Sequence, residues 1–133
     1  MDFVILMVVF LISEYIGDFI LQSREIATTK SSNLDSLQQH SMVVGTIVSI
    51  AMAGAFSYVW DSPAGILGGI FFGMFYGVIH GFQDACIWKV YKYIRREAGE
   101  KFEYWNDKLF YDFIGLDRML HIITATILIA RWS

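Results

Sequence analysis

The sequence is poor in cysteine, proline and charge, and each shortage excludes a class of protein. Cys86 is the one cysteine among 133 residues, so an intrachain disulfide framework and a cysteine-based zinc cluster are excluded. A single proline excludes a proline-rich linker protein. Charged residues make up 17% of the chain, against about 25% in soluble domains, and the net charge of −3 argues against a nucleic-acid partner. The chain has instead 56% hydrophobic residues, which excludes a disordered protein and indicates a small integral membrane protein.

Long apolar runs account for most of the sequence. A helix needs about 20 apolar residues to cross the hydrocarbon core of a bilayer. Helices are expected because backbone polar groups cannot be left without hydrogen bonds in lipid. The predicted fold class is all-α: a polytopic membrane protein with a four-transmembrane-helix bundle that forms a single domain over residues 1–133. The predicted spans are residues 3–21, 42–60, 64–88 and 109–130.

Basic residues are distributed unequally among the connections. Eight of the ten lie in the loops 22–41 and 89–108, whereas Arg131 lies at the other end and Arg118 within the fourth span. Cytoplasmic loops carry an excess of Lys and Arg. Both loops are therefore predicted to be cytoplasmic, with both termini outside.

Local sequence patterns refine the expected boundaries of two helices. Ser, Ser and Asn at 31–33 are good N-cap residues, so the second helix is predicted to begin near Leu34, before the bilayer. A basic, amphipathic stretch follows Trp88, and the third helix is predicted to continue through it to about Gly99.

Glycine recurs every fourth residue along the third span. This spacing places small residues on one face, where two helix backbones can approach closely. Two interpretations stay open: tight packing inside the same bundle, or a homo-oligomer interface. The residues are Gly65, Gly69, Gly73, Gly77 and Gly81.

Ionisable residues inside the spans also recur at a spacing of four. A charge at mid-membrane costs about 2.5–3.5 kcal/mol, and residues four apart share a helix face. Each of three spans therefore presents a polar stripe to a partner, and His40 stands just before the second apolar run. The pairs are Glu14 with Asp18, His80 with Asp84, and Asp117 with His121.

The predicted depths of these residues agree only in part. At about 1.5 Å per residue, Asp18 and His80 lie about 9 Å, and Asp117 about 4–7 Å, to the cytoplasmic side of their span centres. His40 lies about 16 Å from the centre of the second span, and His121 lies nearly at the centre of the fourth span. One metal ion cannot collect ligands over that range. Shifted span boundaries, or two metals sharing the stripe, would each account for the spread.

Imidazole and carboxylate together suit a divalent metal such as Zn²⁺ or Mn²⁺, and pairs four apart on facing helices build such sites in bundles. A bound metal would offset the free-energy cost of burying the carboxylates, and it could generate a hydroxide nucleophile from bound water. Glu14 is a candidate general base or outer carboxylate, His40 a ligand or general acid, and Arg118 a counter-ion or phosphate contact. The candidate ligands are Asp18, His80, Asp84, Asp117 and His121.

Two alternatives use the same residues. They could form a proton or cation path, or interhelical hydrogen bonds that only specify packing. Cys86 points away from the face of Asp84 and is expected to be a buried small residue without a chemical role.

The ordered motifs resemble a known family. In chain order they are EYIGDFILQ from Glu14, Lys30, His40, the motif HGFQD from His80, and GLDRMLH, which contains Asp117 and His121. This set resembles domain-of-unknown-function family 3307, small bacterial and phage membrane proteins, over nearly the whole stretch from Glu14 to His121. Two positions depart from the family pattern: Glu14 stands where the family usually has His, and Arg118 where it usually has Gln.

The resemblance implies a bacterial inner-membrane protein with a metal site. The family pattern is similar to that of inner-membrane metal-dependent hydrolases, and more remotely to helical zinc phosphodiesterases with His-x-x-x-Asp pairs. The first functional hypothesis is therefore a metal-dependent hydrolase that acts at the cytoplasmic leaflet on a phosphoester or lipid-linked substrate. The alternatives are a proton or divalent-cation transporter or channel, and a non-catalytic oligomeric membrane module of phage or defence origin.

Overall fold

The computed structural model describes residues 1–98 and 107–132, and within these ranges the regular structure is entirely helical. Four segments are long and apolar enough to cross a membrane, which confirms the predicted all-α bundle. The elements are α1 (Asp2–Tyr15), the π-helix η1 (Ile16–Ile20), α2 (Arg24–Thr29), α3 (Leu34–Val59), α4 (Ala64–Ala98) and α5 (Lys108–Trp132).

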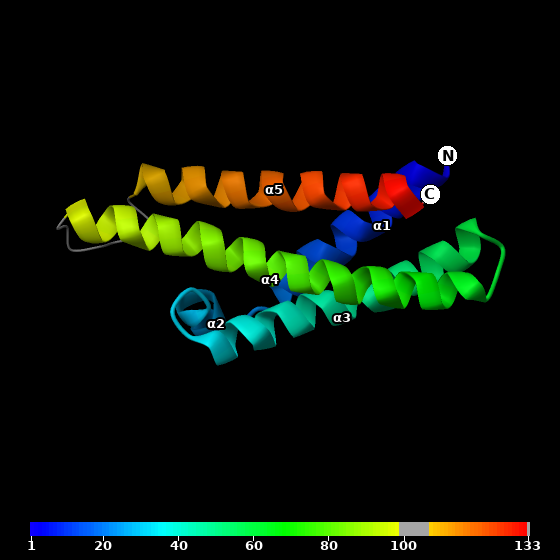
Figure 1. Ribbon diagram of the computed structural model, residues 1–133, viewed down its shortest axis with the longest axis horizontal. Coiled ribbons are helices and arrows are strands. Elements are labelled where there is room, and N and C mark those ends of the chain that lie inside the picture. The colour runs from blue at the N-terminus through cyan, green and yellow to red at the C-terminus, as the bar shows by residue number, and fades with distance from the viewer. Residues whose placement is uncertain (99–106, 133) are drawn as a thin grey trace.

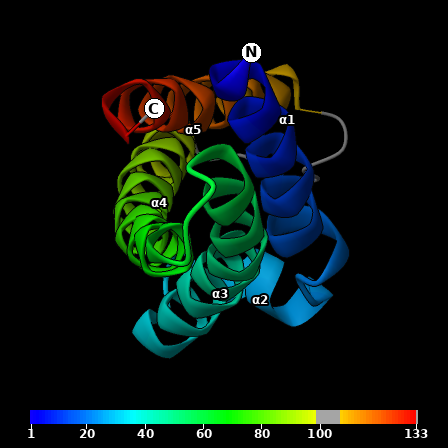
Figure 2. The ribbon, with the colours of Figure 1, turned by 90° about the vertical axis from the view of Figure 1, so that its right-hand side faces the viewer.

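The four spanning segments enclose a common interior. Both termini lie at one end of the bundle together with the α3–α4 turn, and α2 lies at the opposite end (Figure 1). Viewed along the bundle, α1, α3, α4 and α5 surround a shared centre (Figure 2). α1 contacts α3 and α5, and α4 contacts α3 and α5, so the ring of helices is closed.

The pairing of α3 with α4 is the most extensive helix contact, and the glycine face of α4 makes it possible. A Cβ atom on Gly69 would run into the backbone of Ala53, and one on Gly73 into the backbone of Ser49. The glycine spacing therefore serves packing within the chain. A homo-oligomer stays a prediction.

The helix ends follow local capping chemistry. The Asn33 side chain accepts hydrogen bonds from the backbone N–H of Asp35 and Ser36, at 2.8 and 3.4 Å, and α3 begins at Leu34 as predicted. α4 continues to Ala98, close to its expected end. The remaining part of the predicted loop 89–108, residues 99–106, lies outside the described residues.

An apolar core fills the half of the bundle that carries the termini. Its largest side chains pack edge to face: the Phe10 ring lies 6.2 Å from Phe72 and 4.8 Å from Tyr76, centroid to centroid. The outer faces are apolar as well, with Phe71 and Val78 each more than half exposed. Apolar surfaces inside and outside are what a bilayer requires, so the chain is an integral membrane protein. Cys86 is exposed on α4, so the expectation that it is buried is wrong.

Candidate metal centre

The predicted polar residues form one buried group, which we call the His/Asp cluster. Helices from all four spans contribute to it, and none of its residues is more than 4% exposed. It lies in the half of the bundle opposite the apolar core. The members are Glu14 on α1, Asp18 on η1, His40 on α3, His80 and Asp84 on α4, and Asp117 and His121 on α5.

Asp18 lies on a wide helical turn that brings η1 against α3. Gly17, its neighbour, is buried, and a Cβ there would lie 3.0 Å from the Cα of Val44. Single-turn π-helical segments are frequent at functional sites. The close approach that glycine permits places the Asp18 carboxylate beside the α3 histidine.

His40 lies at the centre of the first group of possible ligands. Its Nε2 atom is 3.0 Å from Asp18 Oδ1, 3.0 Å from His80 Nε2 and 3.2 Å from Asp84 Oδ2. One ligand atom from each of these four residues lies within 4.8 Å of every other, a spacing that could hold a metal ion. The expected depth of His40, far from the others, is therefore wrong.

His121 joins a second group on the α5 side. Its ring stacks on that of His80 with the centroids 4.1 Å apart. Its Nε2 atom lies 3.6 Å from Asp84 Oδ1 and 3.8 Å from Asp117 Oδ1, and its Nδ1 atom lies 3.5 Å from Glu14 Oε1. Asp84, Asp117 and His121 also offer ligand atoms within 4.8 Å of one another.

The depths expected for His40 and His121 are wrong because they assume upright spans, each centred on its own apolar run. α3 begins eight residues before the apolar run at 42–60, and α1 crosses the other helices obliquely (Figure 1). Oblique helices of unequal length bring residues of different nominal depth to one place. All seven predicted residues meet in a single cluster.

Lys30 belongs to the cluster, although the sequence placed it only among the cytoplasmic charges of the loop 22–41 and in the resembled motif set. It follows α2, is 8% exposed, and its Nζ atom lies 2.6 Å from Asp84 Oδ2 and 3.2 Å from His40 Nε2. Charge balance is the signal that could have revealed it. The spans carry four acids in the polar stripes and one arginine, so further positive charge is needed in the interior.

Arg118 occupies the position of a counter-ion. Its Nη1 atom donates to both carboxylate oxygens of Glu14 at 2.7 Å, and its Nη2 atom pairs with Asp18. The guanidinium also lies over the Phe19 ring, 4.1 Å from the centroid. Glu14 and Arg118, the two departures from the resembled pattern, are thus direct partners. The general-base role of Glu14 stays a prediction.

Tyr76 closes the cluster toward the apolar core and was not singled out from the sequence. It is fully buried, and its ring centroid lies 5.8 Å from that of His80 and 6.5 Å from that of His121. Tyr76 lies four residues before His80 and therefore on the same helix face, and this spacing could have indicated its place beside the cluster.

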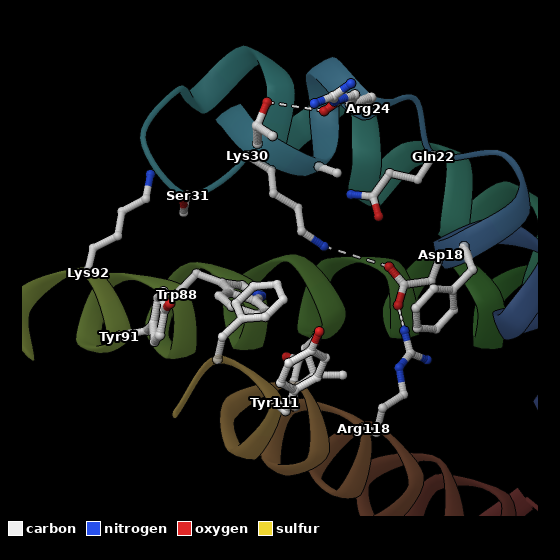
Figure 3. A pocket seen from close by; sticks show the side chains of 16 residues that line it. Asp18, Gln22, Arg24, Lys30, Ser31, Trp88, Tyr91, Lys92, Tyr111 and Arg118 are labelled. Atoms are coloured by element: carbon white, nitrogen blue, oxygen red, sulfur yellow. Dashed lines mark hydrogen bonds and ion pairs between the residues drawn. The ribbon is translucent and has the colours of Figure 1, made fainter. Parts of the chain in front are cut away.

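A cavity of about 530 Å³ connects the cluster with the surface between the α2 region, α4 and α5 (Figure 3). Its deep end is formed by the buried Asp18, Lys30 and Asp117, and its outer end includes the exposed Arg24. Between these ends lie aromatic walls, so an apolar group would fit beside a charged one. The wall residues are Phe19, Trp88, Tyr91, Phe110 and Tyr111.

Comparison with known families agrees with the sequence motifs. The chain matches the family described as "Protein of unknown function (DUF3307)" over residues 6–132, and it belongs to this family. Neither the curated proteins nor the solved structures contain a match.

Proposed function

We propose that this DUF3307 member is an intramembrane metal-dependent hydrolase. Its substrate would be a phosphoester or lipid-linked molecule reached from the cytoplasmic leaflet of a bacterial inner membrane. The observation that carries the proposal is the contact between a buried cluster of imidazoles and carboxylates and a cavity open to the surface. Intramembrane ionisable residues mark functional sites by default.

The donor set fits a divalent metal such as Zn²⁺ or Mn²⁺. Imidazole nitrogens and carboxylate oxygens converge in the cluster, and several of these atoms, His121 Nε2 and Asp117 Oδ1 among them, lack a hydrogen-bond partner within the described residues. Such a metal supplies a Lewis acid and an activated water. The proposed ligands come from Asp18, His80, Asp84, Asp117 and His121, with His40 as ligand or general acid.

Charges along the cavity support an anionic substrate. Arg24 and Lys92 lie near its outer end, and Lys30 and Arg118 near its deep end (Figure 3). Guanidinium and ammonium groups bind phosphate oxygens. The aromatic walls would then hold the apolar part of an amphipathic molecule, while Arg118 would orient the phosphate.

The distribution of basic residues supports cytoplasmic access. Arg24, Lys30 and Lys92 all line the cavity beside α2 (Figure 3), and the termini lie at the opposite end of the bundle from α2 (Figure 1). Basic residues near an anionic leaflet each contribute about 1 kcal/mol of attraction. We therefore place this end at the cytoplasmic face and both termini outside.

The apolar core argues for hydrolysis rather than transport. Phe10, Phe72 and Met52 fill the other half of the bundle and are at most 1% exposed. A proton or cation path through one copy of the chain would have to cross this half, in which the buried side chains of the described residues carry no formal charge. A hydrolase needs access from one side only.

The test is phosphoester hydrolysis by detergent-purified protein with added Mn²⁺ or Zn²⁺, using bis-p-nitrophenyl phosphate and a short-chain phospholipid. We expect Asp117→Asn to lower the rate at least about 100-fold, because even residues that only orient a ligand contribute about 10–100-fold. Asp112→Asn is the matched control, since Asp112 is exposed on the same helix and pairs with Lys108. Equal rates for both variants, or no metal-dependent rate at all, would overturn the proposal.

A further inference from the structure

The Asp84 carboxylate faces two different neighbourhoods. Its Oδ2 atom lies 2.6 Å from Lys30 Nζ and 3.2 Å from His40 Nε2. Its Oδ1 atom lies 3.6 Å from His121 Nε2, on the side of Asp117. A carboxylate so placed separates two positions at which a cation could sit.

A cation already occupies the first of these, which we call the Lys30 position. It is bounded by Asp18, His40, His80 and Asp84 Oδ2. The Lys30 ammonium lies within it, 3.7 Å from Asp18 Oδ1 in addition to its contacts with Asp84 and His40. A metal ion there would meet a positive charge at contact distance, so it could bind only if the lysine left.

The second, which we call the Asp117 position, is bounded by Asp84 Oδ1, Asp117 Oδ1 and His121 Nε2. All three atoms are buried and without a hydrogen-bond partner within the described residues. Arg118 is engaged with Glu14 and Asp18 on another side of the cluster. The cavity reaches Asp117, which gives a route of entry.

Formal charge favours a divalent ion at the Asp117 position. The cluster holds four carboxylates, and its cations are Lys30 and Arg118. With every acid ionised and the histidines neutral, two negative charges are left without compensation. Uncompensated charge in a membrane interior is costly. One divalent cation supplies the missing charge.

We propose that the cluster binds one divalent cation between Asp84, Asp117 and His121, and that the Lys30 ammonium is a built-in cation that keeps a second metal out. One imidazole and two carboxylates suit Mn²⁺, Fe²⁺ or Zn²⁺. The inference deepens the proposed function, from which it takes only the presence of a metal. It assigns Lys30 as a positioning residue that sets the number of ions.

The test counts bound Mn²⁺ on detergent-purified, full-length protein by equilibrium dialysis. We expect one ion per chain in the wild type. His121→Ala and Asp117→Asn should weaken binding at least about tenfold, and His40→Ala should leave it within about threefold. Lys30→Met should admit a second ion, whereas Lys92→Met, which removes a lysine at the outer end of the cavity, should stay at one.

A spectroscopic measurement on the wild type avoids variants that fail to fold. Electron–nuclear double resonance of bound Mn²⁺ with ¹⁵N-histidine should detect one coupled imidazole, that of His121. Two coupled imidazoles would place the ion at the Lys30 position, with His40 and His80, and would overturn the proposal. Loss of the ion in His40→Ala as complete as in His121→Ala would do the same.

The outcomes also separate this inference from the proposed function. One ion at the Asp117 position without phosphoester hydrolysis would support the inference and contradict the hydrolase. Two ions in the wild type, with metal-dependent hydrolysis, would support the hydrolase and contradict the role of Lys30. No bound ion in well-folded wild type would contradict both.

Discussion

The two halves of the bundle hold their helices together by different means. Toward the termini, Phe10, Phe72 and Phe56 interlock in a core without charge. Toward α2, Lys30 and Arg118 hold buried carboxylates from other helices. Lipid is as apolar as the core, so the first half depends on close packing. The second half depends on charge compensation. The comparison distinguishes an apolar half from a half with a candidate metal centre, and we expect different substitutions to destabilise each half.

The largest effect is expected from Lys30→Ala in the polar half. Removing one partner of a buried ion pair costs about 3–5 kcal/mol, because Asp84 would lose its ammonium partner and Asp18 would keep only Arg118. The free energy of unfolding in bicelles without metal measures this loss, and added Mn²⁺ should restore much of it. Lys92→Ala, with its partly exposed side chain, is the control. A Lys30→Ala loss no larger than that of the control would contradict the assigned role.

Gly73→Ala should destabilise the contact between α3 and α4 by about 3 kcal/mol, because the new methyl group meets backbone atoms of Ser49 that cannot move aside cheaply. Gly54→Ala is the matched control. Its methyl group meets nothing within 4 Å, and helix propensity should stabilise it by up to about 1 kcal/mol. Thermal unfolding in detergent compares the two. The same sign for both changes would mean that the α3–α4 contact is not as described.

In the apolar half, Phe72→Ala should lower the free energy of unfolding by about 2 kcal/mol. The loss comes from the packing contacts that the new cavity removes. Transfer of the side chain adds little, because lipid also offers it an apolar environment in the unfolded state. Its neighbour Phe71 is 64% exposed, and Phe71→Ala should change stability by less than about 0.5 kcal/mol. Mn²⁺ binding should survive both changes. Loss of binding in Phe72→Ala with the fold intact would show that the halves are not separable.

The smallest effect is expected at the pair that departs from the resembled family pattern. Glu14→His and Arg118→Gln should each destabilise the fold alone, because each removes the contact between the two side chains, although Arg118 keeps Asp18 as a partner in Glu14→His. The double variant should recover about 1 kcal/mol through their coupling. A double-mutant cycle on unfolding free energy measures it, and strictly additive losses would contradict a direct partnership.

The sequence predicted the membrane class, the four spans and the members of the His/Asp cluster, because apolar runs and spacing of four are one-dimensional signals. It left open what the glycines contact, which the packing of Gly69 on Ala53 answers. It misjudged the depth of His40, gave Lys30 no place in the cluster and missed Tyr76. Helix crossing and the return of the chain after α2 are three-dimensional properties that spacing along one helix does not contain.

The most direct test of the account is the metal content of the purified chain against that of Asp84→Asn. Asp84 is the carboxylate shared by both cation positions. After dialysis against Mn²⁺ and removal of free metal, we predict one ion per wild-type chain and none in Asp84→Asn, with unchanged helical content in both. Equal metal content in the two proteins, or none in the wild type, would contradict the central claim that this buried cluster is a metal centre.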